Sequence, residues 1–150
     1  MRAQKITLEI VMNLLVMLWV YAAVSKLLDY KTFTVQLSKS PLLTSFAPLL
    51  AILVPLIELA IALLLVRPQT LLLGLYSSLF LLVLFTCYLV AILNFSYQIP
   101  CSCGGIIGKG MSWTAHIIFN LGFAVISLFG ILIQERRRKQ FTPFLSTAGT

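Results

Sequence analysis

Two cysteines separated by one residue are the most reactive feature of this sequence. Cys101 and Cys103 stand in the segment Pro100-Cys101-Ser102-Cys103-Gly104-Gly105, whose Pro and Gly residues predict an irregular loop. A disulfide between them would close a small, strained ring, and strained, exposed disulfides tend to be the labile or catalytic ones. Thiol–disulfide exchange, with one cysteine attacking and the other resolving, is therefore the chemistry that we predict for this pair.

Two other interpretations of the pair stay open. The disulfide could only stiffen its loop, although so short a closure removes little entropy from the unfolded chain. The two thiolates could also bind a soft metal such as Cu(I), with Met111 or His116 as a further ligand; we assign no metal site.

The third cysteine, Cys87, falls inside an apolar run, where a lone cysteine is usually a packing residue. It is also a candidate relay for the pair.

A second group of candidate residues is polar and lies within apolar runs. Glu58 is the clearest case, because an isolated carboxylate in lipid must be paired or protonated. Lys26 is its predicted partner, since a lysine stem can reach along a helix bundle. Asn120 lies at a similar predicted depth, with His116 one turn away on the same face. Trp113 is expected at the membrane interface above them. These residues could tune a site below the cysteines or could only hold the helices together.

The elements that must position these residues are apolar helices. Hydrophobic residues make up 60% of the chain and charged residues 10%, against about 25% charged in soluble domains. Each of four apolar runs is close in length to the roughly 20 residues that a helix needs to cross a bilayer. None of them alternates apolar and polar residues as the strands of a membrane barrel do. We therefore predict an all-α integral membrane four-helix bundle, with helices at about Ile6–Leu28, Ala47–Val66, Thr70–Phe95 and Trp113–Ile133.

The basic residues predict the orientation of these helices. Eleven Lys and Arg stand against four Asp and Glu, and they flank apolar runs instead of alternating with aromatic residues as in nucleic-acid-binding domains. Seven of them, with all of the arginines, fall on the side of the two termini. The positive-inside rule then puts both termini in the cytoplasm and two longer loops, about 29–46 and 96–112, outside. We predict a transmembrane domain over residues 1–139 and a disordered tail over 140–150.

Several segments of the sequence together resemble the MauE branch of the DoxX-like membrane proteins. They are Ser25-Lys26-Leu27-Leu28-Asp29 followed by Phe33, Pro55-Leu56-Ile57-Glu58, Cys101-Ser102-Cys103-Gly104-Gly105, Trp113 and Asn120. The resemblance extends over about residues 5–135 and adds Asp29 to the candidate polar residues.

The resemblance implies a redox-associated protein of the bacterial inner membrane, because the family member from methylamine utilisation is implicated in maturing a disulfide-rich periplasmic dehydrogenase subunit. The four-helix arrangement is also similar to the vitamin K epoxide reductase and DsbB proteins, which pass electrons between thiols and quinone. Those relatives carry a second cysteine pair, which this chain lacks, so we expect no cofactor and assign no quinone.

The expected function is thus extracytoplasmic thiol–disulfide exchange in the maturation or redox maintenance of an exported protein. The expected partners are the lipid bilayer and a thioredoxin-like or disulfide-bearing protein, and no nucleic acid. The alternative is a non-catalytic subunit of a larger transport or secretion complex, in which the loop of Cys101 and Cys103 is a docking element.

Overall fold

The computed structural model of the chain describes residues 2–39, 44–95 and 113–147, and every described element is a helix. Four helices are long and apolar enough to cross a membrane, which confirms the predicted all-α fold with four long apolar helices. Their bounds are α1 Arg2–Leu28, α3 Ala47–Val66, α4 Leu71–Phe95 and α6 Trp113–Thr147. The predicted ends of the second and third apolar runs agree with α3 and α4 to within one residue.

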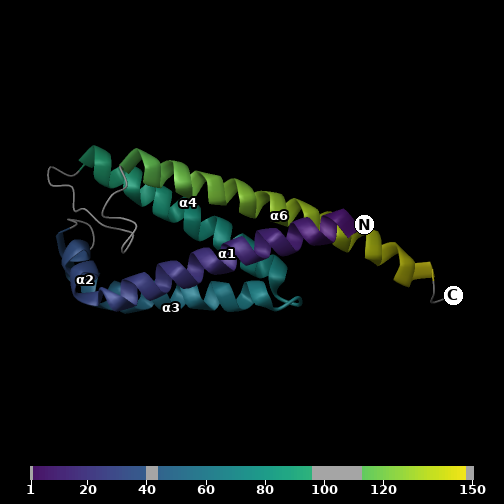
Figure 1. Cartoon of the computed structure of the whole chain (residues 1–150), viewed down its shortest axis with the longest axis horizontal. Helices are drawn as coiled ribbons and strands as arrows, with labels where there is room; N and C mark the ends of the chain where they lie inside the picture. Colours follow the sequence, from purple (N-terminus) through teal and green to yellow (C-terminus); the bar gives the residue numbers. More distant parts are fainter. Residues whose placement is uncertain (1, 40–43, 96–112, 148–150) are drawn as a thin grey trace.

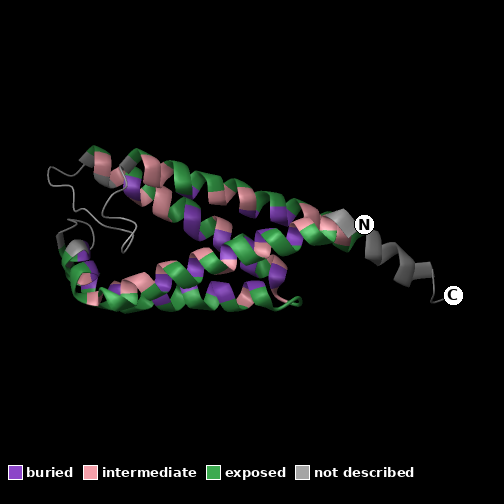
Figure 2. Ribbon diagram, viewed as in Figure 1, coloured by how far each residue is buried: buried purple, intermediate pink, exposed green. Residues whose placement is uncertain are grey.

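The four long helices form two pairs (Figure 1). Helix α1 packs chiefly on α3, and α4 packs chiefly on α6. The two chain termini lie at one end of the bundle, while α2, the end of α4 and the start of α6 lie at the other. Buried residues face the interior of the bundle, and the outer faces of the helices are largely exposed (Figure 2). Large apolar side chains such as Met17, Phe80 and Val125 are among the exposed residues, as expected for helices surrounded by lipid.

Small and hydrogen-bonding residues join the helices, both between the two pairs and within the pair of α4 and α6. A Cβ atom at Gly74 would lie 2.9 Å from the backbone nitrogen of Leu65, so a glycine is needed where α4 approaches α3. The Ser127 hydroxyl of α6 donates to the carbonyl of Leu75 in α4 over 2.9 Å. Trp19 of α1 is buried and donates its indole N–H to the hydroxyl of Ser78 in α4. Close contact and shared hydrogen bonds are the interactions that hold helices together in lipid, where burial of apolar surface gives little driving force.

Two helical segments differ from the prediction. Tyr30–Lys39 forms a ten-residue helix, α2, and Thr44–Phe46 a 3₁₀ turn, both inside the predicted loop 29–46. The α2 helix is amphipathic: Phe33 and Leu37 are one turn apart and bury against Ala47 and Ala51 of α3. Because only one face of this helix is apolar, its average hydropathy is low, and a prediction from average hydropathy gives a loop instead of a helix.

The last helix also runs further than its apolar part. We predicted its end near residue 133 and a tail from residue 140, whereas α6 continues to Thr147. No Gly or Pro stands between residues 131 and 142 to break it. The side chains beyond residue 139 lie outside the described residues.

Candidate functional site

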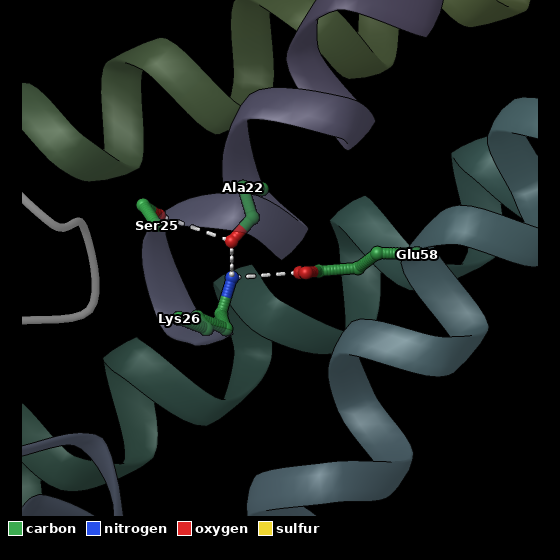
Figure 3. A network of polar contacts seen from close by, with 4 residues as sticks. All are labelled: Ala22, Ser25, Lys26 and Glu58. Carbon is green, nitrogen blue, oxygen red and sulfur yellow. Dashed lines mark hydrogen bonds and ion pairs between the residues drawn. The ribbon is translucent and has the colours of Figure 1, made fainter. Parts of the chain in front are cut away.

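A buried ion pair joins α1 to α3 (Figure 3). The ammonium of Lys26 lies 2.7 Å from Oε1 of Glu58, and it also donates to the carbonyl of Ala22 over 3.3 Å. The Ser25 hydroxyl donates to that same carbonyl over 3.0 Å. The Glu58 side chain is fully buried, and 10% of the Lys26 side chain is exposed. The predicted pairing of Lys26 with Glu58 is therefore confirmed.

The local sequence explains how the pair forms. Lys26 stands in the last turn of α1, where a cation is favoured by the helix dipole and its stem can extend along the neighbouring helices. Glu58 stands three residues after Pro55, in the middle of α3, and both residues face inward. Helix α3 continues through Pro55 without ending. Because Glu58 has no route to water from that position, it needs a cation from another helix.

Two aromatic rings lie beside the ammonium. The rings of Phe33 from α2 and Phe85 from α4 have centroids 5.9 Å and 5.8 Å from Lys26 Nζ. At these distances the ring faces attract a cation. Lys26 of α1 therefore contacts residues of α2, α3 and α4. His116 of α6 is half-buried.

One polar atom of this group is unsatisfied. Oε2 of Glu58 is buried and has no hydrogen-bond partner among the described residues. Native proteins rarely leave such an atom unpaired. The pair therefore offers one free acceptor position beside an ammonium that already has two acceptors.

The other predicted residues are not all brought to this group. Asn120 is buried on the same side of α6 as His116, one turn further on. Asp29 is exposed just after α1, where its backbone carbonyl accepts from the amide of Phe33 over 2.9 Å. Trp113 begins α6, but its side chain lies outside the described residues. Cys101 and Cys103 also lie outside the described residues, so their predicted role stays a prediction.

Cys87 faces away from the ion pair. It is exposed and stands two residues after Phe85, which corresponds to about 200° around an α-helix. Since Phe85 faces Lys26, the Cys87 side chain lies on nearly the opposite side of α4. The relay role that we considered for Cys87 stays a prediction, and this placement does not favour it.

Of the two rings, Phe33 was predicted only as part of a motif, and Phe85 was not predicted. Nothing in the local sequence distinguishes Phe85 from the other aromatic residues of its apolar run.

No group of three or more His, Cys, Asp or Glu that could hold a metal ion occurs within residues 2–39, 44–95 and 113–147.

Comparison with known proteins gives one match. A family model described as methylamine utilisation protein MauE matches residues 4–133, which include the first three apolar spans, most of the fourth, and the ion pair. Searches of curated proteins and of solved structures return no match.

Proposed function

Because the chain belongs to the MauE family of methylamine utilisation proteins, we propose that it is a membrane-embedded thiol–disulfide exchange protein. It would act at the extracytoplasmic face of the bacterial inner membrane in the maturation or redox maintenance of an exported protein. The observation that carries the proposal is the Cys-Ser-Cys sequence between two membrane-spanning helices of a MauE-family chain.

The helices on either side of the cysteines end and begin at the end of the bundle that carries Lys26. The connection that contains Cys101 and Cys103 runs from Phe95 to Trp113, and both of these helix ends lie at the end of the bundle that carries α2 (Figure 1). Lys26, two residues before the end of α1, is at the same end of the bundle.

The proposed exchange proceeds in two steps. The thiolate of one cysteine attacks a sulfur of the partner's disulfide, which forms a mixed disulfide and releases the other partner sulfur as a thiolate that takes up a proton. The second cysteine of the chain then attacks the mixed disulfide. Cys101 and Cys103 become joined, the partner gains two thiols, and two electrons pass from the chain to the partner. A thioredoxin-like dithiol protein would reduce the pair again, and the reverse sequence would oxidise a partner.

The ion pair supports this chemistry by holding the outer end of the bundle. Lys26 and Glu58 tie α1 to α3, and Phe33 and Phe85 add α2 and α4 to the same contact. A rigid outer end would keep the connection between α4 and α6 in one place while a protein partner docks. In this proposal Lys26 and Glu58 are positioning residues, and the chemistry belongs to Cys101 and Cys103.

Trapping of the mixed disulfide tests the proposal. Cys101→Ser and Cys103→Ser chains are expressed separately in a bacterial membrane, free thiols are blocked with N-ethylmaleimide, and adducts are separated on a non-reducing gel. One of the two variants, the one that lacks the resolving cysteine, should accumulate an adduct with an extracytoplasmic protein that reductant dissolves. The matched control is Cys87→Ser, which removes a thiol of α4 and should give the wild-type pattern.

The alternative, a non-catalytic subunit, predicts a different result. The double variant Cys101→Ser/Cys103→Ser would then retain its protein partner through detergent washes, and neither single variant would form an adduct. That outcome, with biological function intact, would overturn the exchange proposal.

A further inference from the structure

A polar side chain stands on the outward face of α1, at membrane depth. Asn13 is exposed, whereas Val11 and Leu15 of the same helix are buried. Asn13 lies in the apolar span Gln4–Leu28, nine residues after its start, which is about 14 Å along the helix. Because the hydrocarbon core is about 30 Å thick, Asn13 lies well inside it, too deep for so short a side chain to reach the interface.

Asn13 is distinguished from the other exposed residues by its polarity. Exposed apolar residues occur on all four spans and therefore single out none of them. Within the part of the chain that the structure describes, Asn13 is the one exposed Asn, Gln, His or charged residue that lies more than two turns from both ends of its span. Glu9 is also exposed, but it lies only five residues from the start of the span.

The carboxamide of Asn13 has no hydrogen bond to satisfy it. At the end of α4, the exposed Asn94 donates to the carbonyl of Val90, one turn earlier in its own helix, over 2.8 Å. Asn13 makes no such bond, nor any other side-chain hydrogen bond within the described residues. An unsatisfied carboxamide in hydrocarbon is unfavourable, and side chains of this type form hydrogen bonds between helices in membranes. The outward face of α1 therefore calls for a partner helix.

The chemistry of Asn13 fits a second copy of the same helix. A carboxamide both donates and accepts, so two Asn13 side chains that face each other across a two-fold axis can form two hydrogen bonds. Copies of one membrane protein insert with the same orientation, so their α1 helices are parallel and each residue on the axis faces its own counterpart. A single Asn in an otherwise apolar contact between helices sets their register and number.

The residues before and after Asn13 allow two parallel helices to meet along their length. Positions 6, 10, 13, 17, 20, 24 and 27 are all exposed and follow one another in alternating steps of four and three residues, which is the spacing of a coiled-coil contact. Apart from Asn13 they are apolar: Ile6, Ile10, Met17, Val20, Val24 and Leu27. Glu9 flanks this line, and a two-fold axis keeps the carboxylates of the two copies on opposite sides of the contact.

We propose that the chain forms a parallel, two-fold symmetric dimer in the membrane through this face of α1, with the two Asn13 carboxamides hydrogen-bonded to each other. The contact involves neither the ion pair of Lys26 nor Cys101 and Cys103, so the dimer does not depend on thiol–disulfide exchange. Each hydrogen bond between membrane helices increases the affinity about threefold, so the two together contribute about tenfold.

Sedimentation equilibrium of the full chain in density-matched detergent micelles tests the dimer. Reductant is present throughout, so disulfides between chains do not contribute. The wild type should show a reversible equilibrium between monomer and dimer. Asn13→Leu should raise the dissociation constant about tenfold, because both hydrogen bonds are lost while the apolar contact remains. Asn13→Gln, whose carboxamide can still donate and accept, should stay within about threefold of the wild type.

Two bulky substitutions locate the contact. Met17→Trp puts a large ring on the contact line, one turn after Asn13, and should abolish the dimer. The matched control is Val125→Trp on the outward face of α6, because Met17 and Val125 are 71% and 66% exposed, and it should leave the dissociation constant unchanged. An equal loss of dimer for the two substitutions would contradict a contact through α1. A monomeric wild type, or equal dissociation constants for the wild type and Asn13→Leu, would refute the proposal.

Photocrosslinking in bacterial membranes distinguishes a second copy from another membrane protein. A photoreactive amino acid takes the place of Met17 or, as the control, of Val125, in cells that express two differently tagged copies of the chain. Irradiation should give a product that carries both tags from position 17 and little of it from position 125. A product that joins the chain to a different protein instead would show that the face has another occupant, and the proposed dimer would be wrong.

Discussion

Replacing Lys26 and Glu58 singly and together should reveal a strong energetic coupling between α1 and α3. Their charged atoms are 2.7 Å apart, and the Glu58 side chain is fully buried. Removing one partner of a buried ion pair typically costs about 3–5 kcal/mol, whereas apolar replacement of both partners is often nearly neutral. We expect Lys26→Met to destabilise the chain by an amount in that range, since the Glu58 carboxylate cannot reach water.

Glu58→Leu should cost less than Lys26→Met. The side chain of Lys26 is already 10% exposed and lies in the last turn of α1, so its ammonium can move outward to the interface. We expect a loss of about 2–3 kcal/mol, below the usual range for an orphaned buried charge. The double variant Lys26→Met/Glu58→Leu should lie within about 2 kcal/mol of the wild type, because no buried charge then remains.

The assay is reversible unfolding in mixed micelles of a mild detergent and dodecyl sulfate, followed by the fluorescence of the buried Trp19. The control is Lys31→Met, which removes an exposed lysine of α2 and should change the free energy of unfolding by less than about 0.5 kcal/mol. If the losses of the two single variants add to within about 0.5 kcal/mol in the double variant, the two residues do not interact and the placement of the site is refuted.

Two further predictions concern orientation and packing. In a chain without its natural cysteines, a cysteine placed at Lys31 should react with a membrane-impermeant maleimide in intact cells, and a cysteine placed at Thr70 should not. The reason is that the arginines, which favour the cytoplasmic side, flank the end of the bundle opposite to Lys31. Reaction at Thr70 and not at Lys31 would show that the topology is inverted. Gly74→Ala should lower the stability in the same mixed-micelle assay by about 1–3 kcal/mol, because its Cβ would lie 2.9 Å from the backbone of Leu65. The control is Gly122→Ala, because a Cβ there would meet nothing within 4 Å. This substitution should leave the stability unchanged or raise it by up to about 1 kcal/mol. An equal loss of stability for both substitutions would contradict the close approach of α3 and α4.

The sequence by itself determined the four apolar helices and the partner of Glu58. Hydropathy is a local property, so the bounds of α3 could be predicted without knowing what surrounds it. The ion pair could be predicted because a carboxylate at membrane depth needs a cation, and few basic residues lie at a comparable depth. The chemistry of Cys101 and Cys103 was likewise inferred from residue types and spacing alone, and it stays a proposal that rests on the sequence and the family.

The tertiary structure decided which faces meet. It showed that Tyr30–Lys39 is a helix, because Phe33 and Leu37 bury against α3. It also put Phe85 over Lys26 and Cys87 on the far side of the same helix. Apolar residues occur on all sides of α4, so its sequence carries little signal for the rotation of the helix about its axis. That rotation is fixed by contacts with residues distant in the chain, as when Gly74 meets the backbone of Leu65 and Trp19 donates to Ser78.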